Sequence, residues 1–343
     1  MQYAVNWKCE KNTLAVKRLK PFIGGGGTPS QLDKEDFETI FYYLHKNYSI
    51  SSHPEITLEA NPDDLTPDYI AMLRTLPFNR LSMGIQTFNE SILKVLQRRH
   101  TARQAIEAFQ NCRAAGFQNI SIDLMYGLPG ETLSTWQQDL DQALLLHPEH
   151  LSAYHLIYEE DTVLWKLREQ HKVEEADEDL SVSLFSTLID RLTSEGYDHY
   201  EISNFSLPGL YSRHNSSYWT EKKYLGCGPS AHSYNGVSRQ WNVASLDTYI
   251  KGISAGTPVF EIEELDLYTR YNDFVITRIR TEWGMPLSKL RDEFGEKLYD
   301  YCLRMAAPHL KQGTLELVND ILKLTRKGIF ISDGIMSDML WTD

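Results

Sequence analysis

The sequence predicts an α/β fold built on a parallel sheet, and three observations support this prediction. Strand-like segments recur with room for a helix between them, the intervals contain helix start and stop signals, and polar motifs follow the strands. The expected strands are Leu19–Ile23, Ile56–Ala60, Arg80–Gln86, Asn119–Tyr126 and Leu151–Ile157. Because parallel strands end at one edge of a sheet, the motifs should meet there.

Helix signals fill the intervals between these strands. Thr66 precedes Pro67, which suits the first position of a helix. Thr101 and Gln104 form a capping box for a helix that should end near Gly116. The alternation of strand and helix therefore continues from one motif to the next.

A long acidic helix, from about Glu174 to Ser194 and closed by Gly196, should follow the last of these strands. Beyond it lies a stretch rich in aromatic and polar residues, 200–241. From about Leu265 helical stretches alternate with three expected strands, which are Thr314–Leu317, Leu322–Thr325 and Ile329–Ser332. This pattern predicts a small helical domain with a β-wing.

The length of 343 residues suits two domains rather than one core. A hydrophobic content of 42% is ordinary for a globular protein, and no apolar run approaches the roughly 20 residues of a membrane span. The first residues contain no apolar signal-peptide core, so we predict a cytoplasmic protein. A formal net charge of −13 disfavours nucleic acid as a partner.

A glycine-rich run follows the first expected strand and reads Gly24-Gly25-Gly26-Gly27-Thr28-Pro29-Ser30. Glycines leave backbone N–H groups open to a ligand, and the proline fixes the exit of the loop. Further motifs follow at strand-plus-helix intervals, and they are Glu59-Ala60-Asn61-Pro62, Gly84-Ile85-Gln86, Arg98 and Ile122-Asp123-Leu124-Met125-Tyr126-Gly127-Leu128-Pro129. The set indicates a loop and strand ends that bind something small.

Together these motifs resemble the radical S-adenosylmethionine (SAM) family of oxygen-independent coproporphyrinogen III oxidases, and within it the heme chaperones of the HemW type. The resemblance implies a partial (β/α)6 barrel that lacks its first β/α unit, with a small C-terminal helical and winged domain. The expected parts are an atypical segment 1–23, a truncated barrel 24–172, a linking helix and His-Asn-x-x-Tyr-Trp region 173–264, and the C-terminal domain 265–343.

The resemblance also implies a SAM site. Its residues are Gly25, Gly26, Gly27 and Thr28 at the amino group of SAM, Glu59 and Gln86 at the ribose, and Arg98 at the carboxylate. These residue types suit the roles, because a carboxylate can accept from both hydroxyls of a diol and a guanidinium binds a carboxylate in a bidentate fashion. The neighbouring Arg99 is expected to be a solvated charge.

Asp123 belongs to the same expected SAM site. It lies between Ile122 and Leu124 in a strand that should be buried, and a buried carboxylate needs a partner. Arg98 or the SAM ribose could be that partner. None of the site residues is a general acid or a nucleophile, so we assign no catalytic residue and expect binding.

A second constellation contains the run His214-Asn215-Ser216-Ser217-Tyr218-Trp219. It resembles the His-Asn-x-x-Tyr-Trp element that serves heme handling in HemW proteins. An imidazole is a usual axial ligand of heme iron, and aromatic neighbours can cover a flat macrocycle. The alternative interpretation of His214 is a hydrogen-bonded structural histidine, and His232 and Cys227 are weaker candidates.

The four cysteines are scattered, at Cys9, Cys112, Cys227 and Cys302. They match no metal-ligand spacing, and each is expected to be a buried thiol. The family resemblance implies a 4Fe–4S cluster held by a C-x3-C-x2-C loop, and the sequence given contains no such loop. We therefore predict no metal ligand in this chain.

The resemblance is expected to begin at residue 24. Two hypotheses account for residues 1–23: a stretch read in the wrong frame, with the cluster loop lost upstream, or the diverged start of a cluster-less paralogue.

The favoured function is heme binding and transfer to a recipient protein, with SAM and a cluster in the intact family member. The first alternative is oxygen-independent coproporphyrinogen III oxidase, which decarboxylates two propionates. The second is a relic that binds heme or SAM without radical chemistry.

Overall fold

The computed structural model describes residues 18–342. The chain divides into two units, which are described separately here. One unit contains residues 21–34 and 55–212, and the other contains residues 35–54 and 213–343 together with the N-terminal residues to Lys20. The boundaries predicted from the sequence stay a prediction.

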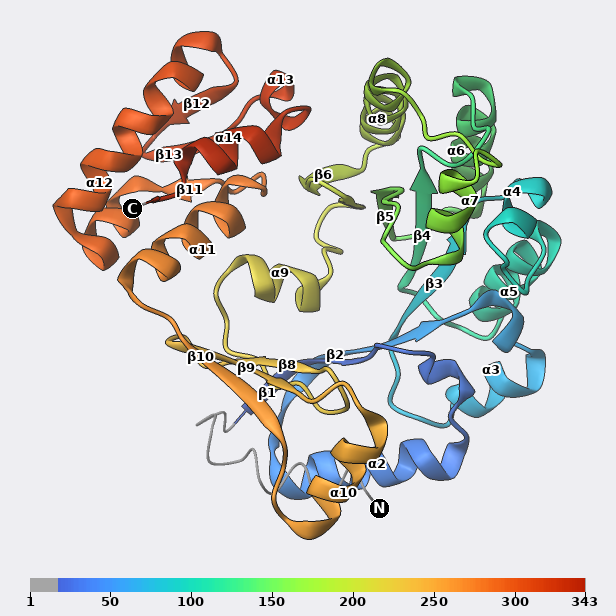
Figure 1. The fold of residues 1–343 in the computed structure, drawn as a ribbon. Helices are drawn as coiled ribbons and strands as arrows, with labels where there is room; N and C mark the ends of the chain where they lie inside the picture. Colours follow the sequence, from blue (N-terminus) through green and yellow to red (C-terminus); the bar gives the residue numbers. More distant parts are fainter. Residues whose placement is uncertain (1–17, 343) are drawn as a thin grey trace. The chain divides into compact units, whose positions relative to one another are not determined.

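The unit of residues 21–34 and 55–212 is organised around a sheet with the strand order β1-β2-β3-β4-β5-β7-β6 (Figure 1). Its strands are β1 (Arg18–Gly24), β2 (Ser49–Ala60), β3 (Arg80–Gln86), β4 (Ile120–Tyr126), β5 (His150–His155), β6 (Asp198–Glu201) and β7 (Asn204–Ser206). Pairing from β2 through β5 is parallel, and β7 pairs antiparallel with both β5 and β6. All five predicted strands are confirmed, and the curled parallel sheet is the predicted partial barrel.

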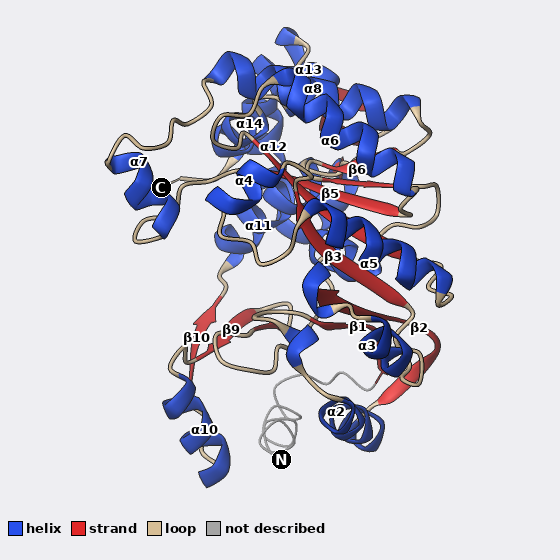
Figure 2. Cartoon of the chain, turned by 90° about the vertical axis from the view of Figure 1, so that its right-hand side faces the viewer, coloured by secondary structure: helices blue, strands red, loops and turns tan. Residues whose placement is uncertain are grey.

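Helices cover one face of this sheet, and Figure 2 shows α5 and α6 lined up along it. The helical elements of the unit are η2 (Pro29–Gln31), η3 (Pro62–Asp64), α3 (Pro67–Leu73), α4 (Glu90–Val95), α5 (Ala102–Ala114), α6 (Leu133–Leu146), α7 (Val163–Glu169) and α8 (Glu178–Ser194). The Thr66 cap and the capping box of Thr101 and Gln104 are present as predicted. α8 begins later than predicted because Asp177 caps it, accepting from the amide of Leu180 at 2.7 Å.

The strands alternate between apolar and polar side chains, as a sheet with one helix-covered face requires. Leu81, Ile122 and Leu151 are fully buried in the core. The intervening positions, among them Arg80, Ser82, Ser121, Asp123, His150 and Ser152, carry polar groups. The other face of the curled sheet is therefore lined with polar side chains.

The second unit contains two three-stranded sheets. Its elements are α2 (Lys34–Asn47), α9 (Arg213–Trp219), β8 (His232–Tyr234), β9 (Ser238–Asn242), α10 (Leu246–Ala255), β10 (Phe260–Glu264), α11 (Leu267–Ile279), β11 (Met285–Pro286), α12 (Leu287–Gln312), β12 (Leu315–Val318), β13 (Ile321–Leu324), α13 (Arg326–Ile329) and α14 (Ser332–Met339). Figure 1 shows α11, α12 and α14 gathered around β11–β13. Residues of α11 and α12 such as Phe274 and Leu290 are fully buried.

Two of the three predicted wing strands are confirmed as β12 and β13, and the third is wrong. Ile329–Ser332 joins α13 to α14, because the Thr325 hydroxyl accepts from the amide of Gly328 at 3.2 Å and starts a helical turn there. The third strand of the wing is β11, which pairs antiparallel with β13. It comes from the chain before α12.

Gly328 has a steric role in this domain. A Cβ built on it would lie 1.9 Å from the carbonyl oxygen of Thr314, a distance that no side chain can occupy. Gly334 in α14 offers a matched comparison, since a Cβ there would meet no atom within 4 Å.

We expect Gly328→Ala to lower the free energy of unfolding by about 2 kcal/mol or more, because the backbone of the wing must move. Gly334→Ala should leave stability unchanged or raise it by up to about 1 kcal/mol, since alanine favours a helix interior. Urea denaturation of both variants measures this. Equal stability of the two would contradict the steric role of Gly328.

Candidate functional site

The predicted SAM-site residues come together within the sheet unit. The glycine run follows β1, Glu59 lies at the end of β2 and Gln86 ends β3. Asp123 lies in the middle of β4, and Arg98 lies in the turn after α4. The contacts described below connect these positions to one another across the strand ends.

The glycine loop closes on the carboxylate of Glu59. The amide of Gly26 donates to Oε2 of Glu59 at 3.3 Å. A Cβ on Gly25 would lie 2.8–3.0 Å from the carboxylate atoms, so a side chain there would force the end of the Glu59 side chain to move away from the loop. Gly26 and Gly27 have φ angles of 77° and 73°, in the left-handed region that glycine adopts without strain. Gly25 to Gly27 and Thr28 remain exposed, so their backbone is accessible beside Glu59.

Glu59 and Asp123 form a pair of partly buried carboxylates. Burial raises the pKa of Glu59, and the Gly26 amide and the charge of Arg80 oppose the rise. Burial, and then the nearby charge of Glu59, raises the pKa of Asp123 to about 6. Arg80 and the hydroxyls of Ser152 and Ser82 act in the opposite direction. The charge of Arg80 therefore only partly offsets the cost of ionising these two carboxylates.

Gln86 lies at an irregularity of the sheet. Its φ of 72° is unusual for a residue other than glycine, and the register between β3 and β4 shifts between Gly84 and Gln86. A Cβ on Gly84 would lie 3.0 Å from Nε2 of the Gln86 side chain. Such bulges redirect a side chain at the end of a strand, and local strain of this kind concentrates at functional sites.

Arg98 is held by neutral acceptors. Its Nη2 donates to Oδ1 of Asn61 at 2.7 Å and to the carbonyl of Gly84 at 3.0 Å. Among the described residues, no carboxylate lies within ion-pair distance of it. Of the two partners expected for Asp123, Arg98 is thus engaged elsewhere, and Ser82 contacts Asp123 at 3.4 Å.

Arg99 behaves as predicted for a solvated charge. It pairs with Asp63 and Asp64 at 3.0 and 3.1 Å, and its side chain is 58% exposed.

The sequence analysis did not assign a role to two residues of the site, Arg80 and Asn61. A pattern in the sequence could have indicated each of them. Arg80, Ser82 and Gly84 alternate with apolar residues along β3, so a period-two reading would have placed the arginine on the polar face. Arg80 is nearly fully buried, and its Nε has no hydrogen-bond partner in the structure. Asn61 was noticed as part of a motif, but its role as the anchor of Arg98 was not.

No described residues form a metal centre. Within residues 18–342, no group of three or more His, Cys, Asp or Glu side chains could hold a metal ion. Cys112 and Cys302 are buried, which raises the pKa of each thiol to about 12, as expected for inert core cysteines. Cys227 is partly exposed, and Cys9 lies outside the described residues.

The His-Asn-x-x-Tyr-Trp run forms α9 in the second unit. Nε2 of His214 lies 2.9 Å from the Tyr218 hydroxyl one turn later, and the two rings meet edge to face with centroids 5.0 Å apart. Tyr218 meets Tyr224 in the same way at 4.9 Å. His214 is partly exposed, and the aromatic rings beside it continue toward β8. His232 is exposed and stacks on Trp241.

Comparison with known proteins identifies the family. Residues 11–143 match the model of the radical SAM superfamily, and residues 265–331 match that of the HemN C-terminal domain. The heme chaperone HemW of Lactococcus lactis is 31% identical over 97% of this chain and 88% of its own length. The chain belongs to the HemN/HemW family of radical SAM proteins. HemW of Bacillus subtilis is 30% identical over 94% of this chain and 86% of its own length.

The solved structure of coproporphyrinogen III oxidase (HemN) from Escherichia coli has the same fold. It superimposes with a TM-score of 0.82 and covers 98% of this chain and 81% of that enzyme, at 22% sequence identity. The superfamily match begins at residue 11, so the similarity to radical SAM proteins extends further toward the N-terminus than residue 24, where the resemblance was expected to start. The hypothesis of a wrongly read segment concerns residues that lie mostly outside the described part.

Burial of the Asp123 charge yields a prediction about stability. Because the pKa of Asp123 is raised from 3.8 to about 6, the folded state holds this proton more tightly than the unfolded state does. Stability should therefore fall as the pH rises from about 4 to about 6. Asp123→Asn removes this penalty and should raise the free energy of unfolding at pH 8 by about 1–3 kcal/mol, with little difference near pH 4.

Urea denaturation at both pH values measures the effect, with the exposed Asp292→Asn as a control. A variant of Asp123 less stable than the parent at pH 8 would show that the carboxylate stabilises the fold.

Proposed function

We propose that this chain is a HemW-type protein that binds heme through α9 and passes it to a recipient protein. The observation that carries the proposal is the identity of 30–31% to HemW chaperones over most of their length. The chemistry of α9 supports it, since an imidazole flanked by tyrosines suits an iron-porphyrin face. His214 is the proposed ligand.

We propose SAM as the ligand of the sheet unit. The donors and acceptors fit it: Glu59 can accept from a ribose diol, and the exposed backbone of the glycine loop lies beside that carboxylate. Arg98, fixed by Asn61 and unpaired with any described carboxylate, is available to the carboxylate of an amino acid. Gln86 ends β3, and Asp123 lies in the middle of the neighbouring strand β4.

A 4Fe–4S cluster does not fit the sequence given. The three cysteines of the described part are two buried thiols and one partly exposed residue, and the whole sequence contains no C-x3-C-x2-C loop. No step through a cluster is proposed for this chain. The proposed roles of its residues are to bind and orient a ligand.

The oxidase is the second candidate, favoured by the likeness of the fold to HemN. At 22% identity this likeness concerns the fold alone. Decarboxylation of coproporphyrinogen III by a cluster-reconstituted form that carries the C-x3-C-x2-C loop would favour the oxidase over the chaperone.

Hemin titration tests the heme proposal. The parent chain should shift the Soret band of hemin, and His214→Ala should weaken binding by about tenfold or more through loss of the axial ligand. His232→Ala, which removes an exposed histidine from the same unit, should bind like the parent. The absence of a Soret shift in the parent would remove the proposal, and equal effects of the two variants would reject His214 as the ligand.

Calorimetric titration with SAM tests the other site. Arg98→Gln should weaken SAM binding by about tenfold or more, because a charge-assisted bidentate contact is lost. Arg99→Gln is the matched control, since this neighbour is solvated and pairs with Asp63 and Asp64. Similar losses in both variants would indicate a general charge effect rather than the proposed contact.

A further inference from the structure

The short helix α9 is too small to define its own position. It contains seven residues, Arg213–Trp219, and isolated helices of this length are unstable in water. The contacts that fix α9 must therefore come from outside it. Arg213–Asp343 fall in one compact unit, so α9 groups with the C-terminal helices.

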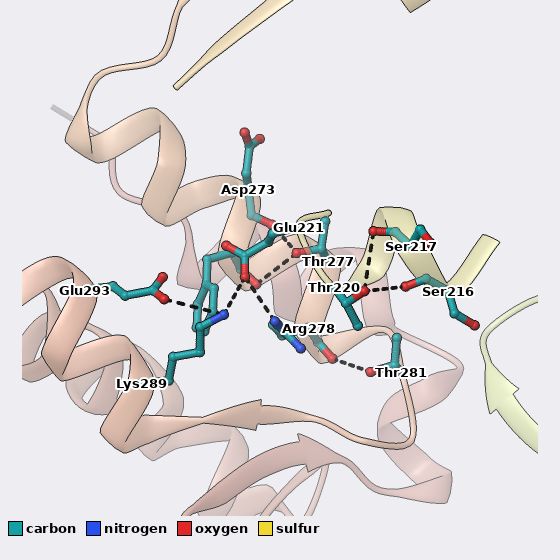
Figure 3. A network of polar contacts seen from close by, with 11 residues as sticks. Ser216, Ser217, Thr220, Glu221, Asp273, Thr277, Arg278, Thr281, Lys289 and Glu293 are labelled. Carbon is teal, nitrogen blue, oxygen red and sulfur yellow. Dashed lines mark hydrogen bonds and ion pairs between the residues drawn. The ribbon is translucent and has the colours of Figure 1, made fainter. Parts of the chain in front are cut away.

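Glu221 supplies the strongest of these contacts (Figure 3). It follows the end of α9 with a φ of 56°, and its Oε2 accepts from Nη2 of Arg278 on α11 at 3.0 Å and from Nζ of Lys289 on α12 at 2.8 Å. The side chains of Glu221 and Arg278 are 21% and 14% exposed, so solvent screens the pairing far less than it would screen a surface salt bridge. One carboxylate thus joins the end of α9 to two helices.

Arg278 and Lys289, the two cations that contact Glu221, pack against the same aromatic ring. Arg278 and Lys289 both lie over the fully buried ring of Phe274, at 5.5 and 5.2 Å from its centroid. Lys289 also contacts Glu293 at 3.5 Å, but Glu293 is more exposed. Without Glu221, two neighbouring cations would lose the carboxylate they share. Moving the end of α9 away would break both ion pairs at once, and the free energy that this costs keeps the end of α9 in place.

A second contact acts on the same end of the helix. The guanidinium of Arg280, which follows α11, covers the indole of Trp219 at 4.1 Å from the ring centroid. The hydroxyl of Thr220 donates to the carbonyl of Ser216 at 2.8 Å and closes the last turn (Figure 3). His214 contacts Tyr218 on the neighbouring turn. Glu221 and Arg280 therefore fix the C-terminal end of α9, and His214 lies about two turns back along the same helix.

We propose that Glu221 is a positioning residue for His214, and that the C-terminal domain sets the geometry of heme binding through the Glu221–Arg278–Lys289 cluster. This inference rests on the proposed heme role of His214. Glu221 itself touches no heme in this scheme; it orients the helix that carries the ligand.

The test compares Glu221→Gln with Glu316→Gln in the full chain. Glu316 pairs with Lys323 at 3.3 Å within the wing, so its variant also loses one ion pair of the same unit. The first readout is amide hydrogen exchange of residues 213–221 without heme. The second is hemin titration, together with the electron paramagnetic resonance signature of the axial ligand.

We expect Glu221→Gln to speed exchange in α9 on the order of tenfold and to shift the axial-ligand signature toward that of His214→Ala. Glu316→Gln should change neither. Unchanged exchange in Glu221→Gln would overturn the positioning role, as would hemin binding through His214 with a signature identical to the parent.

The two proposals fail in distinguishable ways. If no form of the chain binds hemin but Glu221→Gln still speeds amide hydrogen exchange in α9, the heme function is contradicted. The role of the Glu221–Arg278–Lys289 cluster in fixing α9 is then still supported.

Discussion

Negative charge placed on the polar face of the curled sheet is the constraint on which the site in the sheet unit depends. Glu59 and Asp123 are both partly buried, which makes each costly to ionise, and the charge of Glu59 adds to this cost for Asp123. Arg80 is the cation whose charge opposes this cost, and it is itself almost fully buried. Apolar residues would pack at these positions with less penalty. Retaining charged ones is typical of a binding site, where the groups are kept for a ligand rather than for the fold.

The two candidate sites are built in different ways. The candidate site residues of the sheet unit lie in or after strands, and the pairing of those strands fixes their positions. The glycine loop contacts this part of the sheet through Glu59. The heme-binding candidate stands on a seven-residue helix whose position is set by side chains of α11 and α12. The first candidate site is thus fixed by the pairing of backbone strands, and the second by side-chain contacts. In the part of the chain that the structure describes, no helix is both long and apolar enough to span a membrane.

Sequence patterns were sufficient for the sheet, whereas the roles expected of the site residues stay predictions. Alternating strands with caps between them fixed the order of elements, and the motifs at strand ends indicated Glu59 and Gln86. The sequence could not separate a wing strand from a helix at Ile329–Ser332, because a short apolar run has no decisive period. Nor could it show that Glu221 meets Arg278 and Lys289, since these partners are distant along the chain and look like ordinary surface charges. The position of Arg80 on the polar face could have been predicted from the alternation of polar and apolar residues along β3.

The contact between Gly25 and Glu59 has an evolutionary meaning. A side chain at position 25 would displace the carboxylate of Glu59, so a substitution at position 25 changes the position of that carboxylate. In a natural variant that replaces Gly25, the Glu59 side chain would turn away from the loop and the Gly26 amide would lose its acceptor. Joint change at positions 25 and 59 among related chains would therefore show where this contact has been lost, even where the surrounding sheet is preserved.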